Sequence, residues 1–138
     1  MSMFPTLDIS ATGMHAQTVR LNTVASNMAN VDSVSSNAEE TYRGKQPVFE
    51  TILNDETGEP KGGVRVKDII ENEAPLKMEY NPNHPMANDE GYIYRPNVNV
   101  VEEMANMMSA QRSYETNVEV LNTSKQLILR TIQMGKGQ

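Results

Sequence analysis

Proline and glycine are confined to certain parts of this chain, and their distribution limits where long helices can form. None of the seven prolines lies between residues 6 and 46, and none follows Pro96. Glycine is likewise missing between Gly91 and Gly135. Because both residues disfavour a helix interior, the two stretches are where long helices can run. The predicted layout is a helix, an irregular middle and a second helix.

The N-terminal stretch repeats its residues at seven-residue intervals. One row is Leu7, Met14, Leu21 and Met28, and the offset row is Ser10, Gln17, Val24 and Val31. This a/d pattern predicts a helix that packs along a partner helix. Thr6 or Asp8 is the expected N-cap. Gly13 is expected to weaken the first turns, because glycine costs ~1 kcal/mol in a helix interior.

The C-terminal stretch carries a longer version of the same pattern. One row is Val100, Met107, Tyr114, Leu121 and Ile128, and the other is Met104, Gln111, Val118, Lys125 and Ile132. Asn99 followed by Glu102 resembles a capping box. A helix from about Asn99 to Met134 is expected to be ~54 Å long. The N-terminal helix is shorter and cannot cover it, and Val101, Met108 and Leu127 lie off the seam, so we expect an oligomer or a polymer.

Charge divides the chain at the same places. Residues 1–31 hold one acid and one base, residues 32–97 hold thirteen acids and seven bases, and residues 98–138 hold four of each. The charge-poor first segment fits two alternatives: a short helix packed on its own domain, or a helix enclosed on several sides by other chains. The net charge of −6 argues against a general nucleic-acid binder.

The middle of the chain predicts a small β module. Strand-like runs are Val48–Leu53, Val64–Ile70, Leu76–Tyr80 and Tyr92–Tyr94, separated by turn-forming residues. Residues 32–41 are predicted to be a linker. The fold class predicted is mainly α with a small β insert, in which the two terminal helices pair as a coiled-coil-like hairpin. The expected units are residues 1–33, the acidic module 34–97, and the long helix 98–138.

Residues that could support chemistry are few. The chain has no cysteine and no apolar run of membrane-spanning length, and a cleaved secretory signal is not expected. His84 with Asp89 and Glu90 could be read as a weak metal site, but it lies in a turn between prolines and the spacing indicates no third ligand. We therefore expect neither an enzyme nor a bound metal or cofactor.

Two stretches resemble the bacterial flagellar rod and hook protein family. Residues 20–30 (RLNTVASNMAN) are similar to the N-terminal signature of that family, in which an Arg-Leu pair precedes an Ala-x-Asn-x-Ala-Asn core. Residues 95–104 and 109–123 resemble the C-terminal segment of its proximal rod members. The Thr-x-Gly-Tyr that often follows the Asn core is missing, and Asp32-Ser33-Val34-Ser35 stands there.

The resemblance implies a structural role. Rod subunits are exported unfolded by the flagellar type III apparatus, without a cleaved signal, and polymerise in the periplasm into a helical tube. The terminal helices form its inner layers, and the proximal rod joins the membrane ring to the distal rod and transmits torque. The implied partners are copies of the chain, other rod proteins, the membrane-ring and adaptor proteins and the export apparatus; nucleic acid and membrane insertion are not expected.

The heptad rows and the family signature together give a predicted assembly interface. Its residues are Met14, Leu21, Val24, Asn27, Met28, Asn30, Met104, Met107, Gln111, Tyr114, Val118, Leu121 and Ile128. Two other readings compete with a rod subunit. One is a soluble adaptor or chaperone that dimerises through a helical hairpin, and the other is a small metal-dependent hydrolase that uses His84.

Overall fold

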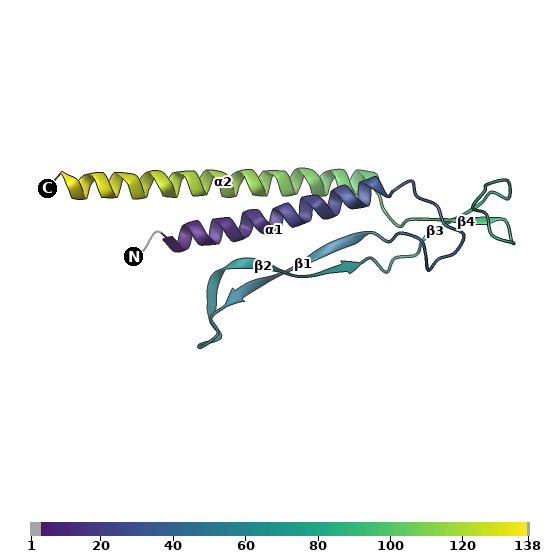
Figure 1. Cartoon of the computed structure of the whole chain (residues 1–138), viewed down its shortest axis with the longest axis horizontal. Helices are drawn as coiled ribbons and strands as arrows, with labels where there is room; N and C mark the ends of the chain where they lie inside the picture. The colour runs from purple at the N-terminus through teal and green to yellow at the C-terminus, as the bar shows by residue number, and fades with distance from the viewer. Residues whose placement is uncertain (1–3, 138) are drawn as a thin grey trace.

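The computed structural model describes residues 4–137, and Figure 1 shows an elongated molecule built from two long helices and two strand pairs. The elements in chain order are α1 (Phe4–Ala29), β1 (Lys45–Leu53), β2 (Pro60–Glu71), β3 (Lys77–Tyr80), β4 (Tyr92–Arg95) and α2 (Val100–Lys136). This arrangement confirms the predicted fold class: mainly α, with a short β module between the terminal helices.

The terminal helices lie side by side and run in opposite directions (Figure 1). Arg20 of α1 donates hydrogen bonds to Asn106 Oδ1 of α2 at 3.2 Å and to Ser109 Oγ at 3.5 Å. α2 has 37 residues and α1 has 26, so the C-terminal end of α2 continues past the first turn of α1. At 1.5 Å per residue α2 is ~56 Å long.

The predicted N-cap is correct for α2 and wrong for α1. Asn99 is the N-cap of α2, and its side chain accepts hydrogen bonds from the backbone N–H groups of Val101 and Glu102. That prediction is confirmed. The N-cap predicted for α1 is wrong, because α1 already includes Phe4 and both Thr6 and Asp8 lie within the helix. The helical pattern before Leu7 carries too few apolar residues to be recognised.

The β1–β2 hairpin lies along α1 on the side away from α2 (Figure 1), which makes α1 the middle layer. The strands are antiparallel, with Lys45 opposite Glu71 and Thr51 opposite Val64. Gly62 and Gly63 have positive φ values of 84° and 93°. A Cβ on Gly62 would lie 2.7 Å from Ile9 Cδ1, and one on Gly63 would lie 3.0 Å from Thr12 Oγ1. Glycine therefore permits both the backbone conformation and the close approach of β2 to α1.

The β3–β4 pair and residues 30–44 form the end of the molecule opposite the chain termini (Figure 1). The predicted linker is anchored there, because Ser35 and Tyr94 exchange two backbone hydrogen bonds at 3.1 and 2.9 Å. Ser36 Oγ also donates to the Met86 carbonyl at 2.7 Å. These bonds fix the path of residues 32–36.

The core is small and has two parts. One lies where β4 leads into α2 and contains the buried side chains of Ile93, Pro96 and Val98. The other is the seam between the helices, where Val24 and Ala110 are buried. A chain with so little internal apolar surface depends on hydrogen bonds and close backbone packing to hold its elements together.

Candidate assembly interface

Asn27 joins the end of α1 to the segment that leads into β1. Its Nδ2 donates to the Lys45 carbonyl at 2.9 Å, and its Oδ1 accepts from the Lys45 N–H at 2.8 Å and from Tyr42 Oη at 2.8 Å. The Asn27 amide also interacts favourably with the carboxylate of Glu103 on α2. A primary amide has two donor hydrogens and two acceptor lone pairs, and Asn27 places both lone pairs and one hydrogen in bonds to Lys45 and Tyr42 while only 1% exposed.

The geometry at Lys45 is that of a strand pairing. One amide side chain donates to the carbonyl and accepts from the N–H of the same residue, as a neighbouring strand does. Asn27 thereby attaches the start of β1 to the end of α1. Glutamine is one methylene longer and aspartate lacks the donor, so the site selects asparagine. This gives a physical reason for the asparagine in the N-terminal signature.

Glu103 faces Asn27 from α2 and is only 8% exposed. Burial raises the pKa of its carboxyl group, and repulsion from Glu102 raises it further, while the hydrogen bond with Asn27 opposes both effects. Its Oε2 is buried without a hydrogen-bond partner among the described residues. The end of α1, the start of β1 and the first turn of α2 therefore meet around one polar cluster, which we call the Asn27 node.

Asn97 forms a second polar joint just before α2. Its Oδ1 accepts from the Gly44 N–H at 2.8 Å, and its Nδ2 donates to the carbonyls of Asn72 and Ala74 at 2.8 and 2.9 Å. Arg43 donates to the same two carbonyls, each at 3.3 Å. The joint ties both ends of the β1–β2 hairpin to the chain that enters α2.

The residues predicted on α1 lie mostly within the chain's own packing. Val24 is 4% exposed and Asn27 is buried, whereas the other members are partly buried: Met14, Leu21, Met28 and Asn30. The Ser26 carbonyl accepts from Asn30 Nδ2 at 2.8 Å and from the Asn30 N–H at 3.2 Å, which closes the end of α1. The sequence left open whether α1 packs on its own domain or is enclosed by other chains. Within the chain, α2 covers one side of α1 and the β1–β2 hairpin covers another.

The residues predicted on α2 divide into two sets. Met107, Tyr114, Leu121 and Ile128 are partly buried beside the seam. The offset row faces mostly outward, with Met104 53% and Ile132 49% exposed, Gln111 and Lys125 exposed, and Val118 partly buried. This row therefore does not line the seam within the chain. The row remains available for contacts with other subunits.

The residues of α2 that face α1 are small or polar, so a search for large apolar residues does not find them. They are Glu103, Ala110, Asn117 and Ser124, again spaced by seven residues. Ala110 is fully buried, and Asn117 lies against Gly13, where a Cβ would come within 2.9 Å of its Nδ2. Small and polar residues in facing positions allow the two helix backbones to approach closely. The glycine predicted to weaken α1 is thus what admits Asn117.

Large apolar side chains are exposed along the outside and at the free end of α2. The most exposed are Val101 (75%), Met108 (59%), Met104 (53%) and Met134 (75%). Leu127, Leu129 and Ile132 are each about half exposed in the segment beyond α1, which we call the α2 overhang (residues 127–136). A soluble monomer rarely exposes so much contiguous apolar surface.

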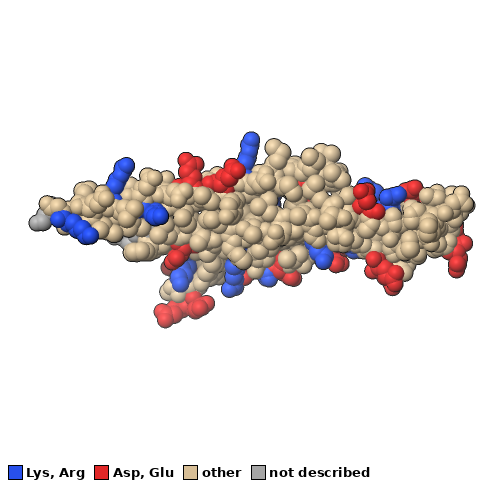
Figure 2. All heavy atoms as spheres, turned by 45° about the horizontal axis from the view of Figure 1, so that its top comes forward, with Lys and Arg blue, Asp and Glu red and all other residues tan. Residues whose placement is uncertain are grey.

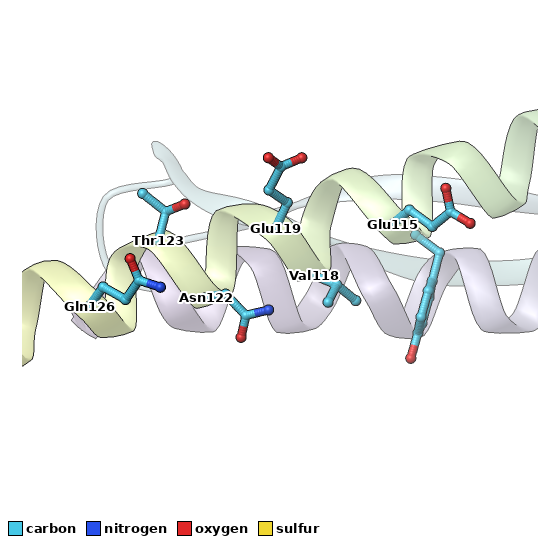
Figure 3. Close-up of a pocket in the computed structure, with 7 residues that line it drawn as sticks. Glu115, Val118, Glu119, Asn122, Thr123 and Gln126 are labelled. Carbon is cyan, nitrogen blue, oxygen red and sulfur yellow. The ribbon is translucent and has the colours of Figure 1, made fainter.

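A groove on the surface of α2 is open to solvent. Its lining includes Glu115, Val118 and Asn122. Figure 3 shows Glu119 and Thr123 on one side of the helix and Val118 and Asn122 on the other, so these side chains do not converge on a common point. Such a surface suits contact with another helix better than it suits a small ligand.

The weak metal site around His84 is not assembled in the part of the chain that the structure describes. His84 Nδ1 accepts a hydrogen bond from the Met86 N–H at 3.0 Å, which closes the local turn. Over residues 4–137 no three side chains of the His, Asp or Glu type come together with the geometry of a metal site. Neither described helix is long and apolar enough to cross a membrane.

Two family models match the chain at its two ends. The model described as "Flagella basal body rod protein" matches residues 7–35, and the model described as "Flagellar basal body rod FlgEFG protein C-terminal" matches residues 89–134. Both polar joints and the seam fall largely within these matches. Asn27 lies in the first, and Asn97 and Glu103 lie in the second.

Curated relatives match the chain over nearly its whole length. The "Flagellar basal-body rod protein FlgC" of Escherichia coli O6:H1 is 48% identical, and that of Salmonella typhimurium is 46% identical; in both cases 99% of this chain and 100% of the relative are covered. The protein of the same name from Bacillus subtilis is 35% identical, again covering 99% of this chain and 100% of the relative.

Proposed function

Because the chain belongs to the FlgC family of flagellar basal-body rod proteins and is a structural subunit of the rod, we propose that it builds the proximal part of that rod. There it polymerises, with other rod proteins, into the tube that joins the membrane ring to the distal rod and transmits torque. The exposed apolar surface of α2 is the observation that supports polymerisation most directly, since it has no covering element among the described residues.

The proposed assembly surface is the outer side of α2, which carries Val101, Met104 and Met108, together with the α2 overhang. Met104, Met108 and Leu129 are 53%, 59% and 49% exposed, so neighbouring subunits can bury them without unfolding the hairpin. Burial contributes about 25 cal/mol per Å² of apolar area. Leu21 and Tyr114, which are also predicted interface residues, are partly buried in the single chain.

The setting of this role is also part of the proposal. The subunit is exported by the flagellar type III apparatus, without a cleaved signal, and assembles in the periplasm beside the membrane-ring and adaptor proteins. We propose a structural role without catalysis, and the residues around the open groove on α2 support it, because their side chains do not converge.

The test is complementation of a bacterium that lacks this protein, with variants on the outer surface of α2. Met108→Asp and Leu129→Asp place a charge where we propose burial against a neighbour, while each side chain is about half exposed in the single chain. We expect normal helix content by circular dichroism, loss of rods from isolated basal bodies, and loss of swimming. Asn22→Asp adds the same charge at an exposed position of α1, outside the proposed surface, and is the matched control that should swim.

Two results would count against the proposal. Rods and swimming that survive both substitutions would remove the outer surface of α2 from the assembly. A discrete dimer in sedimentation of the purified wild-type chain, combined with failure of the wild type to restore rods, would favour the soluble adaptor instead.

A further inference from the structure

We propose that copies of this chain associate head to tail, the α2 overhang of one subunit docking on the β3–β4 end of the next. This inference rests on the proposed polymerisation and names the two surfaces that meet along it. Figure 2 shows the observation that prompts it: basic residues gather where α2 ends, at the left, and acidic residues predominate at the opposite end.

The end of α2 is uniformly basic. From Val120 to Lys136 the helix carries Lys125, Arg130 and Lys136, all exposed, and no acid. Lys136 is the base in the last turn, where it interacts favourably with the negative end of the helix dipole. Lys125 and Arg130 lie too far from the end for that effect, so the dipole alone does not explain the basic end.

The opposite end is acidic, and we call it the acidic end. Its six exposed carboxylates are Asp32, Glu39, Glu40, Glu79, Asp89 and Glu90. The segment 30–44 belongs to this end because Ser35 pairs with Tyr94 of β4. Of the bases nearby, Arg95 is ion-paired with Glu79 at 2.8 Å, and Arg43 is held by backbone carbonyls. Lys77 is exposed on β3.

Both ends also carry exposed apolar side chains. At the overhang, Ile132 is 49% and Met134 is 75% exposed. At the acidic end, Met78, Tyr80 and Met86 are 56%, 65% and 43% exposed. Each end therefore combines an apolar surface with an excess of charge of one sign, which is the composition of a contact that needs a partner of the opposite sign.

The charges select one arrangement of two copies. A contact between like ends would set three bases against three bases, or one mainly acidic end against another, and a reciprocal two-fold pair of unlike ends would close at a dimer. A head-to-tail contact sets the basic overhang against the acidic end. Because that contact uses different surfaces on each copy, it leaves a free end of each kind and can continue. The expected product is a polar row of subunits.

Charge-reversal variants of the full chain test this arrangement in solution. One variant carries Lys125→Glu, Arg130→Glu and Lys136→Glu, and the other carries Glu40→Lys, Asp89→Lys and Glu90→Lys. We expect each alone to self-associate about tenfold more weakly than wild type in sedimentation velocity at low salt. An equal mixture of the two, or all six changes in one chain, restores association, since opposite charges then face each other again.

Two controls sharpen this test. Lys67→Glu changes an exposed base on β2, away from both ends, and should associate like wild type. Wild-type association should weaken between about 0.05 M and about 0.5 M salt, because the screening length shortens. Reversal variants that associate like wild type, or a mixture that fails to recover, would overturn the proposal.

Cross-linking identifies which ends meet. The chain has no cysteine, so Met134→Cys and Met86→Cys each provide a single thiol. A short bifunctional thiol reagent should link the two variants to each other in a mixture far more than it links either variant to itself. Preferred linking within one variant would show that like ends meet, and wild-type association that stops at a dimer would show a reciprocal two-fold pair; either result would overturn the proposal.

Complementation separates failure of this inference from failure of the proposed function. If the wild type does not restore rods, the proposed function itself fails. If the wild type restores rods and each reversal variant does so equally well, only the head-to-tail contact fails. Loss of swimming without any change in self-association would assign the two ends to other rod subunits and would also overturn the proposal as stated.

Discussion

α1 and α2 carry similar heptad patterns but lie in different surroundings. α1 lies between α2 and the β1–β2 hairpin, and its five buried residues are Ser10, Ala16, Thr23, Val24 and Asn27. α2 has 37 residues, of which Glu103, Ala110 and Ser124 are buried. The same sequence periodicity thus serves internal packing in one helix and leaves an open apolar surface on the other.

The comparison shows which forces hold each helix. α1 is fixed by hydrogen bonds and close contacts, because its seam is made of small and polar residues. α2 is held along one narrow row and has surplus apolar surface outside it. Substitutions should therefore affect folding when they lie on α1, and assembly when they lie on the outside of α2.

Removing the amide of Asn27 should have the largest effect on folding. Asn27→Ala leaves the Lys45 N–H and carbonyl without their side-chain partner, while Tyr42 Oη keeps only Ser26 Oγ at 3.1 Å. Unsatisfied buried groups cost ~1–3 kcal/mol each, so we expect a loss of about 3 kcal/mol in the free energy of unfolding. Urea denaturation of the purified chain measures it. Asn22→Ala, at an exposed position of α1, is the control, and an equal effect of both would refute the role of the node.

The two glycines of the helices provide a direct contrast of close and open packing. Gly13→Leu places a side chain where even a Cβ would lie 2.9 Å from Asn117 Nδ2, and should cost about 2 kcal/mol by forcing the helices apart. Gly135→Leu has no atom within 4 Å of its new Cβ and should be neutral or slightly stabilising. Thermal unfolding compares them, and similar changes in Tm would mean that α1 is not closely packed.

Glu103 gives the smallest effect and a dependence on pH. Burial raises the pKa of this carboxyl group above 4.5, so between 4.5 and the raised value the folded state binds more protons than the unfolded state. Stability should therefore fall as pH rises through this window. Glu103→Gln should remove this part of the pH dependence and should be at least as stable as wild type at pH 7, because it removes a buried charge. Urea titrations at several pH values test this, and an unchanged slope would contradict the assignment.

The sequence was informative where hydrophobicity and turn residues decide the outcome. Glycine and proline placed both helices, and β-branched runs together with alternating residues placed all four strands within a few residues. The N-cap at Asn99 followed from residue type alone. In these cases the signal is local, so a single stretch of chain contains the information.

The seam and the polar joints could not be predicted in this way. Ala110 and Ser124 have no hydrophobic signal, and they are buried because Gly13 and its neighbours let the helices come close. Asn27 could be identified from its family signature, but its partners Lys45 and Tyr42 come from a segment whose path depends on Ser35 and β4. Such contacts depend on several segments at once.

The position of α1 between its two neighbours also has a consequence for the order of folding. Asn27 and Lys45 are 18 residues apart in the chain, whereas Arg20 and Ser109 are 89 residues apart. Closing a longer loop costs more entropy, so α1 and the β1–β2 hairpin are expected to join before α2 does. The Asn97 joint then holds the start of α2 beside the hairpin, which reduces the entropy that α2 loses when it docks on α1. The helix whose outer side we propose to meet neighbouring subunits is then the last to be placed.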